Sequence, residues 1–136
     1  EAIILNGDTY FDVDLNEMVA KHRTEKDSLL TIALKPMKDF DRYGTVSTDD
    51  EGRVLKFNEK QPCEEGVING GVYVLEKDET IFEGQPKKFS FETAVMQEQC
   101  GEMGCLFGVI QNGYFIDIGI PEDYHKADRE FPTLFK

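Results

Sequence analysis

The apolar run Ala2-Ile3-Ile4-Leu5 breaks off into Asn6-Gly7-Asp8, and this transition constrains the fold more than any other feature of the sequence. A continuous apolar run that ends in turn-forming residues is typical of a strand buried on both faces. Asp8 would then follow the carboxyl end of the strand, which is the edge where open α/β sheets bind ligands. The pattern therefore predicts an α/β fold with a polar site beside Asp8.

Strand-like and helical segments alternate early in the chain, and hairpin patterns dominate its middle. Apolar residues at helical spacing follow Asp12 and Asp14, either of which can cap a helix that runs to about Lys26. An acidic turn ending in Gly52 separates two β-type segments and indicates a hairpin. We expect strands at 29–34, 44–48, 53–57 and 67–75.

The C-terminal part of the chain repeats both patterns. Ser90 is a candidate cap for a short helix that ends before Gly101, and Asn112-Gly113 is a favoured turn pair for a hairpin. Pro121 suits the first turn of a last helix. We expect strands at 106–110 and 114–118 and an inner helix face of Tyr124, Ala127 and Phe131. The whole chain, 1–136, is thus predicted to be one α/β domain with a mixed sheet and flanking helices.

Charge limits the partners of the chain. Acidic side chains outnumber basic ones 27 to 15, which gives a net charge of −12. Such a field repels nucleic acid and anionic membranes, so we expect neither as a partner. An anionic small substrate would need a bound divalent cation or a few well-placed Lys and Arg residues.

The cysteines indicate a reducing compartment. Cys63, Cys100 and Cys105 are an odd set whose spacing matches no zinc or redox motif. Reduced thiols in a cytoplasm are the simpler interpretation. The sequence shows no membrane-length apolar run and no basic signal peptide, so we expect a cytoplasmic location.

Asp8 and Asp117 are candidate metal ligands. Both follow apolar, strand-like runs, and each has a glycine close by. If the two strands are adjacent, the carboxylates converge and form a hard oxygen site suited to Mg²⁺. On spacing alone, two turn-forming aspartates are the simpler interpretation.

Three further segments have two interpretations each. Glu59 and Lys60 suit a sugar phosphate, because a carboxylate accepts hydrogen bonds from hydroxyl groups and an ammonium group attracts a phosphate. A solvated surface pair is the alternative. Arg42-Tyr43-Gly44 is either a close approach to a ligand beside an aromatic wall or an ordinary loop. Asn69-Gly70-Gly71 is either a ligand contact or a β-bulge.

Two other motifs favour ordinary structure. Asp12-Val13-Asp14 begins like a calcium loop, but Glu17 and Arg23 occupy the positions that need glycine and glutamate. His22 and His125 have no serine or cysteine nucleophile nearby, so we expect surface histidines.

Several motifs, taken together and in order, resemble the sugar-1-phosphate nucleotidyltransferases. Their residues are similar to those of the heptose- or mannose-1-phosphate guanylyltransferase branch. The set covers nearly the whole chain, although no single motif is decisive. The motifs are Leu5-Asn6-Gly7-Asp8, Tyr43-Gly44-Thr45-Val46, Phe57-Asn58-Glu59-Lys60-Gln61-Pro62, Asn69-Gly70-Gly71-Val72-Tyr73 and Phe115-Ile116-Asp117-Ile118-Gly119-Ile120-Pro121.

The resemblance implies a Rossmann-like, GT-A-type fold and a site for a sugar 1-phosphate, a nucleoside triphosphate (GTP by branch) and Mg²⁺. Asp8 and Asp117 would bind the metal and, with Lys60, act as catalytic residues. The sugar phosphate would attack the α-phosphate of the triphosphate and displace pyrophosphate, without a protein nucleophile. The implied substrate-binding residues are Gly44, Glu59, Lys60, Asn69, Gly71 and Tyr73.

The chain departs from the family in lacking the Gly-rich loop with Gly-Thr-Arg that wraps the triphosphate. It resembles only the C-terminal, sugar-side part of the family, so we do not expect activity from this part alone. The absent half should also contribute strands, and we therefore expect poor solubility or self-association into a homo-oligomer.

Two alternatives stay open at this point. A glycosyltransferase would use Asp12-Val13-Asp14 as its metal motif, and substitution of Asp12 rather than Asp8 would then abolish metal-dependent binding. A non-catalytic sugar-phosphate-binding or oligomerisation domain would bind its ligand without turnover.

Overall fold

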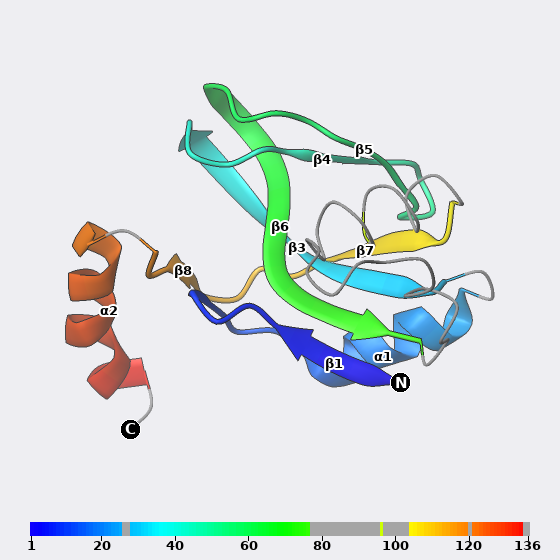
Figure 1. Cartoon of the computed structure of the whole chain (residues 1–136), viewed down its shortest axis with the longest axis horizontal. Coiled ribbons are helices and arrows are strands. Elements are labelled where there is room, and N and C mark those ends of the chain that lie inside the picture. Colours follow the sequence, from blue (N-terminus) through cyan, green and yellow to red (C-terminus); the bar gives the residue numbers. More distant parts are fainter. Residues whose placement is uncertain (26–27, 77–95, 97–103, 120, 135–136) are drawn as a thin grey trace, which may run out of the picture.

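The computed structural model describes residues 1–25, 28–76, 96, 104–119 and 121–134. Its centre is a four-stranded sheet in the order β1-β6-β3-β7 (Figure 1). β3 is parallel to β7, whereas β6 is antiparallel to both β1 and β3. The mixed sheet predicted from the sequence is therefore confirmed. Its strands are β1 (Ala2–Leu5), β3 (Leu30–Phe40), β6 (Cys63–Leu75) and β7 (Leu106–Ile110).

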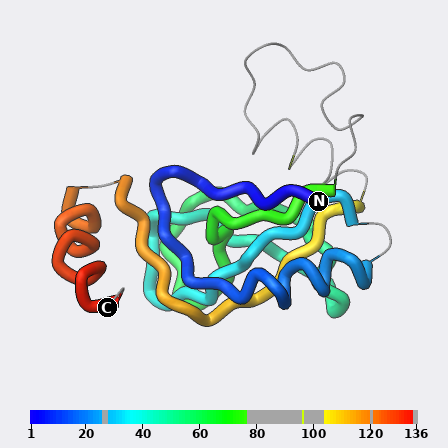
Figure 2. Tube along the Cα trace, turned by 90° about the horizontal axis from the view of Figure 1, so that it is seen from below, coloured from blue at the N-terminus to red at the C-terminus, as the bar shows by residue number. Residues whose placement is uncertain are grey.

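Two short ribbons and two helices complete the described fold. β2 pairs with β8, and β4 pairs with β5 as the predicted hairpin. In Figure 2, α1 runs along one face of the sheet, and α2 lies at the end of the molecule beyond β8. The bounds are β2 (Thr9–Phe11), α1 (Leu15–Thr24), β4 (Val46–Thr48), β5 (Val54–Phe57), β8 (Phe115–Asp117) and α2 (Pro121–Leu134).

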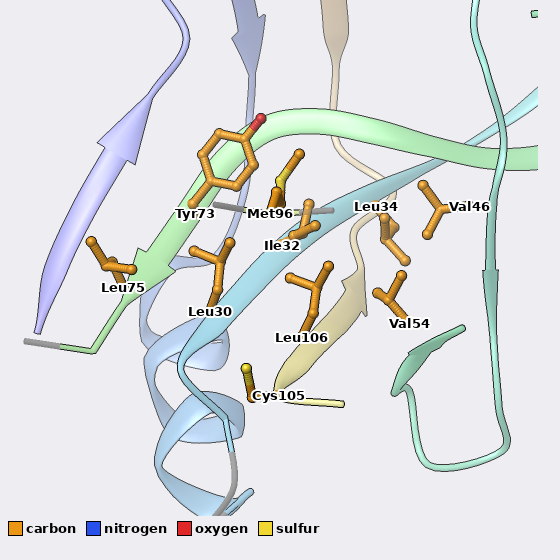
Figure 3. Close-up of a cluster of buried hydrophobic side chains, with 10 residues drawn as sticks. All are labelled: Leu30, Ile32, Leu34, Val46, Val54, Tyr73, Leu75, Met96, Cys105 and Leu106. Atoms are coloured by element: carbon orange, nitrogen blue, oxygen red, sulfur yellow. The ribbon is translucent and has the colours of Figure 1, made fainter. Parts of the chain in front are cut away.

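The inner strands β3 and β6 are buried on both faces, which explains their continuous apolar runs. β1 is an edge strand and mostly exposed, with Leu5 66% exposed, so the burial expected for Ala2–Leu5 is wrong. On one face, Leu30 and Leu34 of β3 pack in a cluster with Val46 and Val54 of the β4–β5 ribbon (Figure 3). On the other face, Ala33 of β3 packs in a second cluster, to which α1 and β2 contribute Met18 and Phe11. The sheet thus holds the β4–β5 ribbon on one side and the β2 strand on the other.

The hairpin expected around Asn112-Gly113 is wrong. β7 pairs with β3 in the central sheet, while β8 leaves that sheet and pairs with β2. The connection is fastened elsewhere, because the Lys35 ammonium donates to the Gly113 carbonyl at 2.7 Å and the Asp12 amide donates to the Tyr114 carbonyl at 2.8 Å. A Cβ at Gly113 would overlap the Asp12 carbonyl oxygen, so glycine is needed here for a close approach rather than for a hairpin turn.

The helices agree with the sequence only in part. Asp14 caps α1, since its carboxylate accepts a hydrogen bond from the Glu17 amide at 3.1 Å. On α2, Ala127 is buried as expected, but Tyr124 is 57% exposed and does not belong to an inner face. The helix expected to begin at Ser90 lies outside the described residues. No helix in the described part of the chain is long and apolar enough to cross a membrane.

The expectation that His22 is a surface residue is wrong. Its ring is 2% exposed, and Nδ1 lies 2.8 Å from the Thr31 hydroxyl and 3.2 Å from the Ser28 hydroxyl. Its Nε2 lies 2.8 Å from a Glu76 carboxylate oxygen. His22 therefore joins α1 to β3 and to the end of β6 through a buried polar network.

We expect His22→Ala to lower the free energy of unfolding by about 2 kcal/mol, because it leaves a cavity and removes hydrogen bonds from buried hydroxyl groups. Urea denaturation measures the difference. His125→Ala on exposed α2 is the matched control and should change stability by less than ~0.5 kcal/mol. Equal losses from the two substitutions would contradict a structural role for His22.

Candidate functional site

A cleft of about 630 Å³ opens between the β4–β5 ribbon and the neighbouring ends of β1, β2 and β8. Its floor includes Ile68 and Asn69 of β6. The structure thus brings together residues from distant parts of the chain. The sequence-predicted residues in its lining are Asp8, Gly44, Glu59, Lys60, Asn69 and Asp117.

Asp8 and Asp117 meet because β2 pairs with β8. Thr9 lies opposite Asp117 in that ribbon, and the Ile118 amide donates to the Asp8 carbonyl at 2.8 Å. Both carboxylates lie beside Gly119, where an added Cβ would stand 2.9 Å from Asp117 Oδ1 and 3.7 Å from Asp8 Oδ2. The sequence argument required the strands next to the two aspartates to be adjacent. The pairing of β2, which begins directly after Asp8, with β8 meets this condition.

The donor set at this point fits a hard divalent cation. Asp8 is exposed and Asp117 is half-buried, so the pair offers carboxylate oxygens with room for water or substrate oxygens. Mg²⁺ typically takes one or two carboxylates and completes its shell with such ligands. The Asp117 carboxylate is also oriented, because its Oδ1 accepts a hydrogen bond from the Gly119 amide at 2.7 Å.

Tyr43 provides a second contact that orients Asp117. The Tyr43 hydroxyl donates to Asp117 Oδ2 at 3.3 Å. Burial, followed by the nearby charge of Asp117, raises the pKa of Tyr43 to about 12. The phenol therefore stays protonated at neutral pH and remains a donor to the carboxylate.

Arg42 lies at the same rim, and the sequence had marked the Arg42-Tyr43-Gly44 segment as a possible ligand contact without giving the arginine itself a role. Its guanidinium stacks over the Tyr43 ring, 5.3 Å from the ring centroid. Nη2 donates to the Tyr43 hydroxyl oxygen at 3.2 Å and to Asp123 Oδ2 at 2.8 Å. The bond to Asp123 raises the pKa of Arg42, which keeps the guanidinium charged. The place of Arg42 directly before Tyr43-Gly44 was the signal in the sequence.

Glu59 and Lys60 are exposed at the cleft, at the end of the β4–β5 ribbon. The residue before them is fixed, because the Asn58 amide donates to the Thr45 carbonyl at 2.8 Å and its side chain donates to the Thr45 hydroxyl at 2.9 Å. A Cβ at Gly44 would overlap the Asn58 carbonyl oxygen. Glycine at this position lets the two segments approach closely enough to place Glu59 and Lys60 at the cleft.

The Asn69-Gly70-Gly71 segment forms the irregularity that the sequence left open. The register between β3 and β6 shifts between Ile32 and Leu34, opposite this segment. Gly71 has a φ of +79°, and its amide donates to Asn69 Oδ1 at 2.9 Å. Asn69 Nδ2 donates to the buried Tyr73 hydroxyl at 2.9 Å. Gly71 and Tyr73 are outside the described cleft lining and hold Asn69, which belongs to it.

The rival metal motif is placed differently. Asp12 and Asp14 are outside the lining of the cleft as the structure describes it, and Asp14 is engaged as the cap of α1. A triad of Glu1, His22 and Glu76 also has its potential ligand atoms within 4.8 Å of one another. There, His22 already has partners on both ring nitrogens.

Comparison with known proteins gives evidence about the family of this chain that is independent of the cleft geometry. The chain is similar to D-glycero-alpha-D-manno-heptose 1-phosphate guanylyltransferases from Aneurinibacillus thermoaerophilus (49% identity, covering 94% of this chain and 54% of the relative) and Campylobacter jejuni (43%, covering 92% and 53%). A solved structure of HddC from Yersinia pseudotuberculosis, complexed with GMP-PN, matches with a TM-score of 0.75 at 38% identity, covering 95% of this chain and 54% of that one.

These matches show which family the chain belongs to and how much of its relatives' length it covers. The chain spans about half the length of the curated relatives that it matches. The sequence profile of the family described as nucleotidyl transferase matches residues 1–133. This chain belongs to the nucleotidyl transferase family.

Proposed function

We propose that this chain forms the sugar-phosphate and metal side of a sugar-1-phosphate nucleotidyltransferase that transfers GMP from GTP. The observation that carries the proposal is the convergence of Asp8 and Asp117 in one cleft with Glu59 and Lys60. Two of the relatives are heptose 1-phosphate guanylyltransferases, which supports a sugar phosphate and a guanine nucleotide as the substrates.

Three of the cleft residues contact the sugar phosphate in this proposal. Lys60 contacts the phosphate of the sugar 1-phosphate, Glu59 accepts hydrogen bonds from sugar hydroxyl groups, and Asn69 contacts the sugar across the floor of the cleft. A phosphate oxygen of the sugar phosphate attacks the α-phosphorus of the triphosphate; a new P–O bond forms and pyrophosphate departs. Such a transfer depends on positioning and charge neutralisation rather than on a protein nucleophile.

The charges of the cleft explain why a cation is part of the proposal. In its described lining, Asp8, Glu59 and Asp117 face only two basic residues, Arg42 and Lys60. Two phosphate-bearing substrates would meet net repulsion there. Mg²⁺ held by Asp8 and Asp117 would supply positive charge at the reacting phosphates. Lys60 and Arg42 would supply the rest.

We expect Lys60→Ala to weaken the binding of mannose 1-phosphate by about tenfold, because the substitution removes a charge-assisted contact to the phosphate. Calorimetric titration with and without Mg²⁺ measures the dissociation constant. Lys56→Ala is the matched control, since Lys56 is an exposed lysine of the same ribbon outside the described cleft lining. Equal effects of the two substitutions would contradict the assigned role of Lys60.

A measurement of turnover distinguishes an enzyme from a non-catalytic binding domain. Release of pyrophosphate from GTP in the presence of a sugar 1-phosphate, measured in the full-length protein that carries this chain, would support nucleotidyl transfer. Comparison with ATP, UTP and CTP tests the preference for GTP. Binding of the sugar phosphate without pyrophosphate release from any nucleotide would favour the non-catalytic alternative.

A further inference from the structure

A chain of hydrogen bonds connects the first turn of α2 to the carboxylate of Asp117. Asp123 accepts from Arg42 Nη2 at 2.8 Å, Nη2 also donates to the Tyr43 hydroxyl at 3.2 Å, and Tyr43 donates to Asp117 at 3.3 Å. In Figure 1, α2 stands apart from the central sheet, next to β8. Asp123 is therefore a point at which this outlying helix reaches the candidate site.

Arg42 keeps much of its binding capacity unused. Both of its hydrogen bonds within the described part of the chain are made by Nη2, so Nε and Nη1 have no described partner. The side chain is 44% exposed, and the residue lines the cleft. Nε and Nη1 lie on different sides of the guanidinium, so each can donate a single charge-assisted hydrogen bond to a phosphate oxygen.

Stability alone does not account for this arrangement. An exposed ion pair such as Arg42 with Asp123 contributes little to folding, because solvent screens the charges and two side chains must be ordered. Its position does matter electrostatically, since Arg42 is one of only two basic residues in the described lining of a cleft with three acidic ones. A guanidinium held at this rim offsets the repulsion that a phosphate would meet from Asp117.

We propose that Arg42 is a second phosphate contact in the cleft, in addition to Lys60, and that Asp123 of α2 is its positioning residue. The inference rests on the proposed function, because it assigns the phosphate of that substrate to one more side chain. Asp123 and the Tyr43 ring together fix the guanidinium, which leaves its Nε and Nη1 groups available to the ligand. The helix α2 thereby becomes part of the binding site rather than a peripheral element.

The test is calorimetric titration with mannose 1-phosphate and with uncharged mannose. Arg42→Ala should weaken binding of mannose 1-phosphate by about tenfold and leave binding of mannose unchanged. Arg42→Lys should recover only part of the loss, because an ammonium group restores the charge but cannot stack on the Tyr43 ring as the planar guanidinium does. Arg129→Ala, an equal change of charge at an exposed position of α2, is the matched control and should have little effect.

Asp123→Asn tests the positioning role. It should weaken binding of the phosphate ligand by about threefold in the wild-type background and have no further effect in Arg42→Ala, because positioning acts only through Arg42. Equal effects of Arg42→Ala and Arg129→Ala would overturn the inference. If Lys60→Ala still weakens binding in that case, the proposed function stands without it. If the wild-type protein binds no mannose 1-phosphate, both proposals fall.

Discussion

Asp117→Asn is expected to lower kcat/KM for nucleotidyl transfer by about a hundredfold or more in the full-length protein that carries this chain. The substitution removes one of two carboxylate charges from the proposed cation site. It keeps the shape of the side chain and an oxygen to accept the Gly119 amide, which donates at 2.7 Å in the native chain. Steady-state kinetics over a range of Mg²⁺ concentrations would show the loss, and excess Mg²⁺ should restore part of the rate.

Two further substitutions make this prediction specific. Asp8→Asn should cause a loss of similar size, because Asp8 lies beside the same glycine as Asp117. Asp12→Asn is the control, since Asp12 is an exposed aspartate outside the described lining of the cleft. The opposite pattern, with Asp12 essential and Asp8 dispensable, would identify the Asp12-Val13-Asp14 segment as the metal motif and contradict the proposed site.

The sequence predicted the buried parts of β3 and β6, at 29–34 and 67–75, because burial leaves a direct signal. It missed the extension of β3 to Phe40 and the start of β6 at Cys63, where more exposed residues interrupt the apolar pattern. β3 and β6 face packed side chains on both sides, so their apolar runs are continuous and easily recognised. The β4–β5 hairpin was equally clear from its acidic turn and Gly52, whose φ is +89°. In these elements, residues close in sequence determine the structure.

Pairing between distant segments was harder to predict. Asn112-Gly113 has the composition of a hairpin turn, yet β8 pairs with β2, about a hundred positions earlier in the chain. The local propensity of a turn pair is outweighed by the hydrogen bonds of that ribbon. His22 was missed for a related reason, because its partner Glu76 is 54 positions away and a buried polar network has no local pattern.

The candidate site likewise contains residues that the sequence identified and residues that it missed. Asp8 and Asp117 were identified as a pair only on the condition that their strands are adjacent, and the β2–β8 ribbon supplies that condition. Arg42 and Asp123 were not identified as a pair, since 81 positions separate them and nothing in the sequence links the Arg42-Tyr43-Gly44 segment to the last helix. Side chains that act through a neighbour are visible only when the distances between elements are known.

Gly70→Ala is expected to lower the free energy of unfolding by about 3 kcal/mol, because overpacking a buried site forces neighbouring atoms out of their favoured positions. A Cβ at Gly70 would overlap the Phe11 ring and stand 3.0 Å from the Ala33 carbonyl oxygen. Phe11 is 6% exposed and belongs to the cluster that packs β2 and α1 against the sheet. Chemical denaturation monitored by circular dichroism measures the loss.

Gly7→Ala provides the matched control, because an added Cβ there has nothing within 4 Å. It should change stability by less than ~0.5 kcal/mol. The double substitution Gly70→Ala with Phe11→Leu should be less destabilised than the sum of its parts, since the smaller side chain vacates the space that the new methyl group needs. If the two losses of stability simply add, the destabilisation by Gly70→Ala does not come from contact with the Phe11 ring, and the strain lies elsewhere in the β6 bulge. In the expected case, Gly70 leaves the space in which Phe11 packs β2 against the sheet. Gly70 thereby supports the pairing of β2 with β8, which brings Asp8 close to Asp117.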